Sequence, residues 1–136
     1  MNEQTILIVD DENSIRELLA LYFRKEGFHV EEAADGAQAL LGLEKFKPDL
    51  VLLDIMMPKV DGFDTLDILR NTPQIGATKV IVLTALSQEG DRQRAKDLGA
   101  DDYLVKSQVV ITDVISRVKF HLGLETQPTP PATPAQ

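Results

Sequence analysis

The side chains with the most chemical potential in this sequence are three carboxylates, one hydroxyl and one amine. Each stands at the end of a short apolar run, directly or one residue later: Asp10, Asp11, Asp54, Thr84 and Lys106. Continuous apolar runs of this length are typical of strands that are buried on both faces of a parallel sheet. Ligand sites in open α/β sheets form beyond the carboxyl ends of the strands, so we expect these five side chains to meet at one edge.

Such a set of side chains favours phosphoryl chemistry assisted by a metal ion. Carboxylates that lie close together raise one another's pKa and destabilise the fold unless a cation neutralises them. Hard oxygen ligands without sulfur or imidazole suit Mg²⁺, which takes one or two carboxylates together with phosphate oxygens. Lys106 could hold a phosphoryl oxygen as a point charge, and Thr84 could donate a hydrogen bond to another. A carboxylate can itself accept a phosphoryl group and form an aspartyl phosphate.

The elements that must position these side chains alternate along the chain. Five strands are predicted, the second of them weaker than the rest: Thr5–Val9, Phe28–Ala33, Leu50–Leu53, Val80–Leu83 and Tyr103–Val105. Five helices are predicted from apolar stripes and their boundaries: Ile15–Phe23, Ala37–Phe46, Phe63–Leu69, Gln88–Leu98 and Ile111–Leu122. This βα order, repeated five times, implies an α/β fold with a doubly wound parallel sheet and helices on both faces.

Several helix ends carry recognisable signals. Ser14 with Glu17 could form a capping box at the start of the first helix. Gly27 is a plausible residue just beyond its end, and Gly99 ends the polar fourth helix in the same way. Asp61 is the predicted N-cap of the third helix.

Size and composition set the outer limits of the function. A chain of 136 residues fits one domain, and the absence of cysteine excludes disulfides and thiolate chemistry. A net charge of -8 argues against direct nucleic-acid binding and suits protein partners. No apolar run approaches the roughly 20 residues of a membrane span, and the N-terminus lacks a signal peptide, so a cytoplasmic protein is expected. Residues 125–136 hold four of the seven prolines and are predicted to form an extended tail or linker.

Four motifs in the expected order resemble a known family. ILIVDDE at 6–12, LLDIMMPKVDG at 52–62, VLTA at 82–85 and DDYLVKS at 101–107 are similar to the response-regulator receiver domains of two-component signalling. The resemblance runs from about Thr5 to Leu124, which makes residues 1–124 the receiver domain. It implies a five-stranded parallel sheet of order 2-1-3-4-5. It also implies a switch that a histidine kinase or phosphotransfer protein phosphorylates.

The resemblance assigns a role to each matching residue. Asp54 corresponds to the phosphoacceptor, with Asp11 the more direct Mg²⁺ ligand and Asp10 acting through water. The backbone carbonyl of Met56 would complete the metal ligands, and Mn²⁺ would suit the same oxygens. Three residues would meet the phosphoryl group: Thr84, Ala85 and Lys106. Tyr103 corresponds to the aromatic residue that turns inward when the threonine moves towards the phosphate.

Two positions affect how such a switch would behave. The family usually has proline after the lysine, joined by a cis bond, and Ser107 stands there instead. A cis bond before a non-proline residue costs about 3 kcal/mol, so we expect a trans bond. In the family, the residues two positions after the acceptor and two positions after the threonine influence the rate at which the aspartyl phosphate is hydrolysed. Here these residues are Met56 and Leu86, and both are apolar. Neither side chain can position a water molecule, so slow autodephosphorylation is expected. The chain is expected to be a signalling switch and not an enzyme.

Phosphorylation would act on the face formed by residues 88–98, the last strand and the last helix. Homodimerisation through this face is a further expectation, because its charged side chains could pair across two copies: Arg92, Arg94, Asp101, Asp102 and Arg117. The output domain or effector protein is left open.

Three other classes of function are weaker alternatives. A phosphatase that uses an aspartyl phosphate would need a second acid where Met56 stands. A flavin or nucleotide carrier would need a small-residue phosphate loop in place of Asp10-Asp11-Glu12, which would repel a phosphate. An interaction module without phosphorylation would not need the complete acceptor set.

Overall fold

The computed structural model describes residues 3–125, in which five strands alternate with five α-helices and one short 3-10 helix. The parallel strands form one sheet of order β2-β1-β3-β4-β5: β1 (Thr5–Val9), β2 (His29–Ala33), β3 (Leu50–Leu53), β4 (Lys79–Thr84) and β5 (Asp102–Val105). The helices are α1 (Asn13–Lys25), α2 (Gly36–Phe46), α3 (Gly62–Arg70), α4 (Glu89–Asp97), η1 (Lys106–Gln108) and α5 (Ile111–His121). The predicted fold class and strand order are confirmed.

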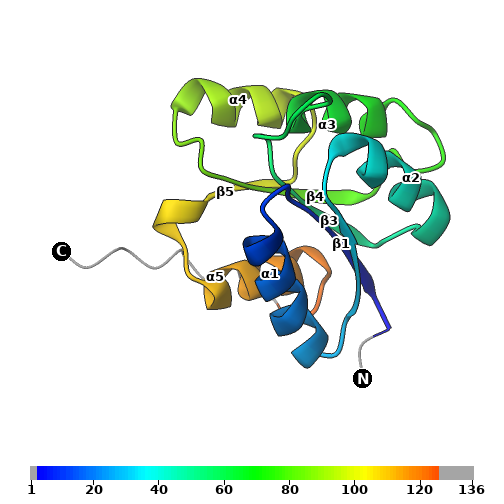
Figure 1. Cartoon of the computed structure of the whole chain (residues 1–136), viewed down its shortest axis with the longest axis vertical. Coiled ribbons are helices and arrows are strands. Elements are labelled where there is room, and N and C mark those ends of the chain that lie inside the picture. The colour runs from blue at the N-terminus through cyan, green and yellow to red at the C-terminus, as the bar shows by residue number, and fades with distance from the viewer. Residues whose placement is uncertain (1–2, 126–136) are drawn as a thin grey trace.

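Helices cover both faces of the sheet, with α1 and α5 on one face and α2, α3 and α4 on the other (Figure 1). Successive residues of a strand point to opposite faces, so the side chains of each strand alternate between the apolar core on one face of the sheet and the core on the other. Ile6 and Ile8 of β1 pack with Phe23 on the α1 and α5 side. Leu7 and Val9 pack on the α2 and α3 side. This explains why the strands read as continuous apolar runs.

The register of the sheet brings the ends of β1 and β3 level with each other. Val9 is paired with Leu53, and the Asp54 N–H donates to the Val9 carbonyl at 3.0 Å. The Asp10 N–H donates to the Ala33 carbonyl of β2 at 3.1 Å. Residues that follow these strands are therefore neighbours at one edge of the sheet.

The ends of the helices agree with the sequence signals except at the start of α1. Gly27 and Gly99 follow helix ends with φ of 93° and 101°, and the Asp61 side chain accepts from the Asp64 N–H. The predicted capping box of Ser14 and Glu17 is wrong. The helix begins at Asn13, with Glu12 as its N-cap and no side-chain cap, so Ser14 already lies inside the first turn.

The reason for the early start of α1 lies in the loop before it. The Asp10 carboxylate accepts the Glu12 N–H at 2.9 Å, and the Arg16 N–H donates to the Glu12 carbonyl at 3.0 Å. These two bonds turn the chain into the helix directly after the acidic residues. A side-chain cap at Ser14 is thereby replaced by the hydrogen bonds of the Asp10 turn.

Arg70, at the end of α3, is hydrogen-bonded to two loops, the one between α3 and β4 and the one between α4 and β5. Its guanidinium donates to the carbonyls of Gly76 and Thr78 and, at 2.8 Å and 3.0 Å, to the carbonyl of Gly99. It also contacts the Asp101 carboxylate at 3.0 Å. The C-terminal end of α4 and the start of β5 are therefore attached to α3.

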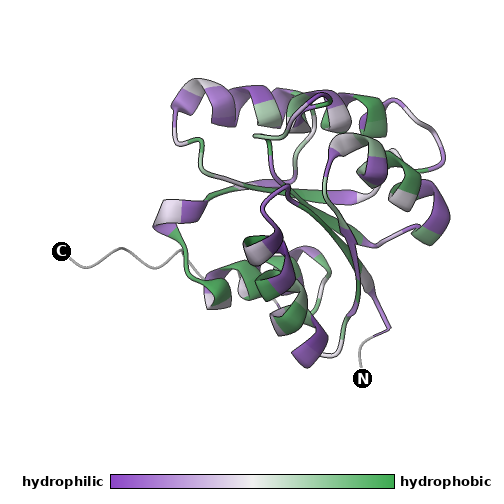
Figure 2. Cartoon of the chain, viewed as in Figure 1, coloured by the Kyte–Doolittle hydropathy of each residue, from purple (hydrophilic) through white to green (hydrophobic). Residues whose placement is uncertain are grey.

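Helix α4 is the most polar of the five α-helices, as Figure 2 shows, and Ala95 is its one buried residue. Its N-cap, Gln88, forms no side-chain hydrogen bond with the helix. None of the helices formed by residues 3–125 combines the length and apolar character that a membrane crossing requires. The proline-rich segment that was predicted to be a tail lies outside the described residues, apart from Glu125.

Candidate functional site

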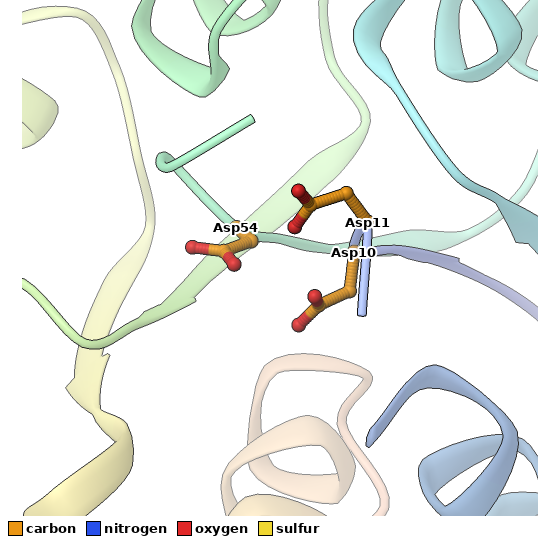
Figure 3. A group of neighbouring side chains, drawn as sticks. All are labelled: Asp10, Asp11 and Asp54. Carbon is orange, nitrogen blue, oxygen red and sulfur yellow. The ribbon is translucent and has the colours of Figure 1, made fainter. Parts of the chain in front are cut away.

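Three aspartates gather at the carboxyl edge of the sheet, as the strand ends predict. Asp10 and Asp11 follow β1 and Asp54 follows β3, and Figure 3 shows their carboxylates side by side. One carboxylate oxygen from each of the three lies within 4.8 Å of the others. Asp10 and Asp54 are buried, whereas Asp11 is exposed. Three hard oxygen donors at this spacing fit a divalent cation such as Mg²⁺.

All the polar atoms of Asp10 are engaged within the protein. One carboxylate oxygen accepts from the Glu12 N–H, and the other lies 2.7 Å from the Lys106 ammonium. Its backbone N–H donates to Ala33, and its carbonyl accepts from the Arg16 guanidinium at 2.9 Å. Asp10 is thus held firmly, which leaves Asp11 as the carboxylate that is freer to meet an ion.

Asp54 carries a carboxylate that is costly to keep ionised. Burial raises its pKa above the ordinary 3.8, and the neighbouring charge of Asp10 raises it further. The Lys106 ammonium at 3.2 Å and hydrogen bonds from Thr84 and the Met56 N–H oppose this rise, but the pKa remains raised. A cation added next to Asp54 would favour its ionised form.

Lys106 links the two buried carboxylates. Its ammonium bridges Asp10 and Asp54, and its side chain is 18% exposed. Burial alone would lower its pKa, but the hydrogen bond with Asp10 and the charges of both aspartates outweigh burial, so the pKa is raised. Lys106 is therefore a fixed positive charge beside Asp54. The short helix η1 starts at this lysine, and no peptide bond between residues 3 and 125 is cis, as expected with Ser107.

Thr84 is the last residue of β4 and is fully buried. The Thr84 hydroxyl accepts the Leu86 N–H at 3.4 Å, and Thr84 is one of the groups that lower the pKa of the Asp54 carboxyl. Ala85, which follows it, is exposed at the same edge. The Met56 N–H donates to Asp54 at 3.2 Å, and the Met56 side chain is more than half exposed.

Tyr103 lies buried under α4 in this structure. Its hydroxyl donates to the Leu86 carbonyl at 2.9 Å, and the Arg92 guanidinium lies over its ring at 4.9 Å. Burial raises the pKa of Tyr103, and Asp91 and Asp54 add to that effect while Arg92 opposes it. The tyrosine therefore connects the loop after Thr84 to β5.

An open hollow of about 450 Å³ adjoins the acidic site, with Asp11 in its wall. Apolar side chains form most of the remaining lining, among them Met56, Phe63 and Leu86. Arg94 of α4 lies over the Phe63 ring at 4.1 Å and also lines the hollow. This hollow leaves the Asp11 side of the acidic site accessible from outside.

The charged residues expected to pair between two copies are already engaged within one copy. Asp102 accepts from Arg117 at 2.6 Å, and it also contacts His121. Asp101 is bound by Arg70. Arg92 contacts the Tyr103 ring and lies 3.7 Å from Glu89 of its own helix.

Sequence reasoning missed Arg16, whose guanidinium reaches the backbone of the acidic pair. It donates to the Asp10 carbonyl, to the Asn13 side chain at 2.8 Å and to Glu32 of β2 at 3.2 Å. The second strand, whose end offers no chemistry, therefore supports the site through Glu32. The residues around Arg16 form no motif for this role, because Glu32 reaches it only through the pairing of β1 with β2.

Comparison with known proteins agrees with this geometry. The sequence profile of the family described as "Response regulator receiver domain" matches residues 6–118. The transcriptional regulatory protein ResD of Bacillus subtilis is 42% identical over 127 residues, which cover 93% of this chain and 51% of ResD. The transcriptional regulatory protein CpxR of Escherichia coli is 52% identical over 101 residues, which cover 74% of this chain and 42% of CpxR. The chemotaxis protein CheY4 of Vibrio cholerae has a similar structure, with a TM-score of 0.81 and 30% identity over 87% of this chain and 98% of CheY4.

The fold and the family match together define the class: this chain belongs to the response regulator receiver domains of two-component systems. The resemblance recognised in the sequence is confirmed. Receivers of this family are signalling modules rather than conventional enzymes, and they interact with histidine kinases. The triad of Asp10, Asp11 and Asp54 is typical of the Mg²⁺ site of a receiver. The chain spans about half the length of the curated relatives it matches.

Proposed function

We propose that this chain accepts a phosphoryl group onto Asp54 from the phosphohistidine of a histidine kinase or phosphotransfer protein. The observation that carries the proposal is the position of Asp54. Its buried carboxylate shares Lys106 with Asp10, and it lies within 4.8 Å of an exposed third carboxylate, Asp11. A structural aspartate of this kind would need no second and third acid beside it.

The transfer itself is a displacement at phosphorus. A carboxylate oxygen of Asp54 forms the new P–O bond while the P–N bond to the histidine breaks, and the imidazole leaves with the electron pair of that bond. Bound Mg²⁺ would neutralise the carboxylates and draw the phosphoryl oxygens towards them. Asp11 and Asp54, with the Met56 carbonyl, are the proposed ligands, and Asp10 is proposed to act through water. Mn²⁺ would suit the same oxygens.

Residues at the end of β4 and β5 are proposed to hold the phosphoryl group after transfer. Lys106 already contacts the Asp54 oxygen at 3.2 Å, so a small shift would place its ammonium against a phosphoryl oxygen. Thr84 lies on the same side and would donate its hydroxyl to another oxygen. The exposed Ala85 leaves room beside it. Apolar Met56 and Leu86 offer no group that orients water, so we propose slow loss of the phosphate without a partner.

The response to phosphorylation is proposed to pass through Thr84 and Tyr103. Tyr103 is bonded to the Leu86 carbonyl, two residues beyond Thr84, so a movement of the threonine loop changes what holds the ring. The face formed by α4, β5 and α5 would then shift between two pre-existing states. An output domain, an effector protein or a second copy of the chain would recognise this face. Response regulators typically act in the cytoplasm, and we propose the same location here.

Labelling with a small phosphodonor such as an acyl phosphate tests the assignment of Asp54. In the presence of Mg²⁺ the unchanged chain should gain one hydroxylamine-sensitive phosphoryl group, which intact-mass spectrometry detects. Asp54→Ala should abolish the label. The control Asp64→Ala, at an exposed position of α3, should keep it. Labelling of Asp54→Ala at the rate of the unchanged chain would overturn the proposal.

A further inference from the structure

Arg16 connects three elements at the acidic edge of the sheet. From the first turn of α1 its guanidinium donates to the Asp10 carbonyl at 2.9 Å, to Asn13 at 2.8 Å and to Glu32 at 3.2 Å. The side chain is 13% exposed, so these bonds form largely away from water. An arginine fork suits such a role, because its planar donors can satisfy several acceptors at once.

The Asp10 carbonyl belongs to the peptide bond that joins Asp10 to Asp11. The Asp10 side chain and N–H are fixed by their own partners, and Arg16 fixes the carbonyl. By contrast, Asp11 is exposed, and within residues 3–125 its side chain forms no hydrogen bond or ion pair. The direction in which the Asp11 carboxylate leaves the backbone is therefore set by the orientation of this peptide.

We infer that Arg16 is a positioning residue for the divalent-cation site. By holding the Asp10–Asp11 peptide, it keeps the Asp11 carboxylate within 4.8 Å of Asp54 before an ion arrives. The inference rests on the proposed function, because it assumes that the triad binds Mg²⁺. Some residues orient a metal ligand without binding the metal themselves. Replacing such a residue typically weakens metal affinity by about 10- to 100-fold.

Charge alone predicts the opposite effect of replacing Arg16. The guanidinium is a positive charge near the triad, and its removal would reduce repulsion of an incoming cation. On electrostatic grounds Arg16→Met should therefore bind Mg²⁺ more tightly than the unchanged chain. A positioning role predicts weaker binding, so the sign of the change separates the two explanations.

Helix α1 supplies a matched control. Arg24 is the second arginine that contacts Glu32, at 3.5 Å, and it also donates to the Val30 carbonyl. It carries the same charge on the same helix, but it does not reach the Asp10 carbonyl. Arg24→Met therefore removes one positive charge, one contact with Glu32 and the hydrogen bond to Val30, and it leaves the contacts of Asp10 and Asp11 in place.

The test is a Mg²⁺ titration of the intact chain at constant ionic strength, followed by amide chemical shifts. Arg16→Met should weaken Mg²⁺ binding about tenfold, and Arg24→Met should leave it within about twofold. Arg16→Lys, which keeps the charge without the fork, should also bind more weakly than the unchanged chain. Spectra recorded without Mg²⁺ will report whether each variant is folded. If Arg16→Met does not fold, Arg16→Lys takes its place in the comparison with Arg24→Met.

Three outcomes would overturn the inference. They are equal affinities for Arg16→Met and Arg24→Met, tighter binding by Arg16→Met, and no Mg²⁺ binding by the unchanged chain. If the unchanged chain binds Mg²⁺ but gains no phosphoryl label at Asp54, the proposed phosphoryl transfer is contradicted instead. The comparison of Mg²⁺ affinities between the two arginine variants would then still report on Arg16.

Discussion

Asp10 and Asp11 are adjacent in the sequence but differ in almost every physical respect. Asp10 is buried and shares the Lys106 ammonium with Asp54, whereas Asp11 is exposed beside the hollow. Burial of Asp10 is tolerable because each of its oxygens has a charged or backbone donor. This division fits the proposed roles, in which Asp11 meets the ion and Asp10 supports the site.

The burial of Tyr103 can be tested by measuring the ionisation of its phenol. The chain has two tyrosines, and burial raises the pKa of Tyr103 above the ordinary 10.0. Because the folded state prefers the neutral phenol, stability is unaffected below about pH 10 and falls as the pH rises further. We expect an ultraviolet titration to show a late phenolate step that is missing from Tyr103→Phe. A late step that persists in Tyr103→Phe would contradict the burial described here.

Much of the site at the residue scale could be predicted because strand ends are visible in the sequence. Asp10, Asp54 and Lys106 each follow an apolar run, and parallel strands bring such ends together. The contacts of Arg16 with Glu32 and of Arg117 with Asp102 could not be predicted. They join side chains 16 and 15 positions apart, and their meeting depends on how the helices pack against the sheet.

At the scale of the elements, two glycines have opposite surroundings. A Cβ on Gly62, at the start of α3, would lie 2.3 Å from the Asp54 carbonyl oxygen and 2.5 Å from the Ile55 Cα. A Cβ on Gly90, in α4, would meet nothing within 4 Å. The loop after Asp54 is therefore packed against the start of α3, whereas Gly90 in α4 has open space beside it.

The two glycines form a matched pair for a stability measurement. Gly62→Ala should lower the free energy of unfolding by about 2 kcal/mol or more, because the obstruction is backbone that must shift. Gly90→Ala should raise it by about 0.5 kcal/mol, since alanine loses less backbone entropy in a helix. Urea unfolding followed by circular dichroism measures both. Equal unfolding midpoints for the two variants would contradict the close approach at Gly62.

Element boundaries could be predicted to within a residue or two, and the start of α1 shows why a local signal can fail. Ser14 and Glu17 have the spacing of a capping box, but the helix begins before them. The hydrogen bond from the Glu12 N–H to Asp10 fixes that start, and it depends on the geometry of the acidic site. A site that imposes its own turn can therefore override a capping preference.

At the scale of the whole molecule, three neighbouring carboxylates weaken the fold when no cation is present. Burial is the main cause of the raised pKa of Asp54, and the charge of Asp10 adds to it. An ion that binds only the folded state stabilises it according to its concentration and affinity. The proposed metal site should therefore be visible in the stability of the entire chain.

Thermal unfolding with and without Mg²⁺ measures that link. Saturating MgCl₂ should raise the melting temperature by a few degrees over NaCl of the same ionic strength. Asp11→Asn should lose most of this rise, because it removes the exposed ligand. It should not melt below the unchanged chain without Mg²⁺, since a repulsive charge is gone. An equal rise in Asp11→Asn would show that the ion binds elsewhere.

The attachment of Arg70 makes the two ends of α4 unequal. Arg70 holds the Gly99 carbonyl and Asp101 at the C-terminal end, whereas Gln88 at the N-terminal end forms no side-chain cap. A rigid body fixed at one end moves by rotation about that end. We therefore expect α4 to pivot near Gly99, with the largest displacement at the N-terminal end, which adjoins Leu86. Small changes at Asp54 would be converted into a tilt of α4.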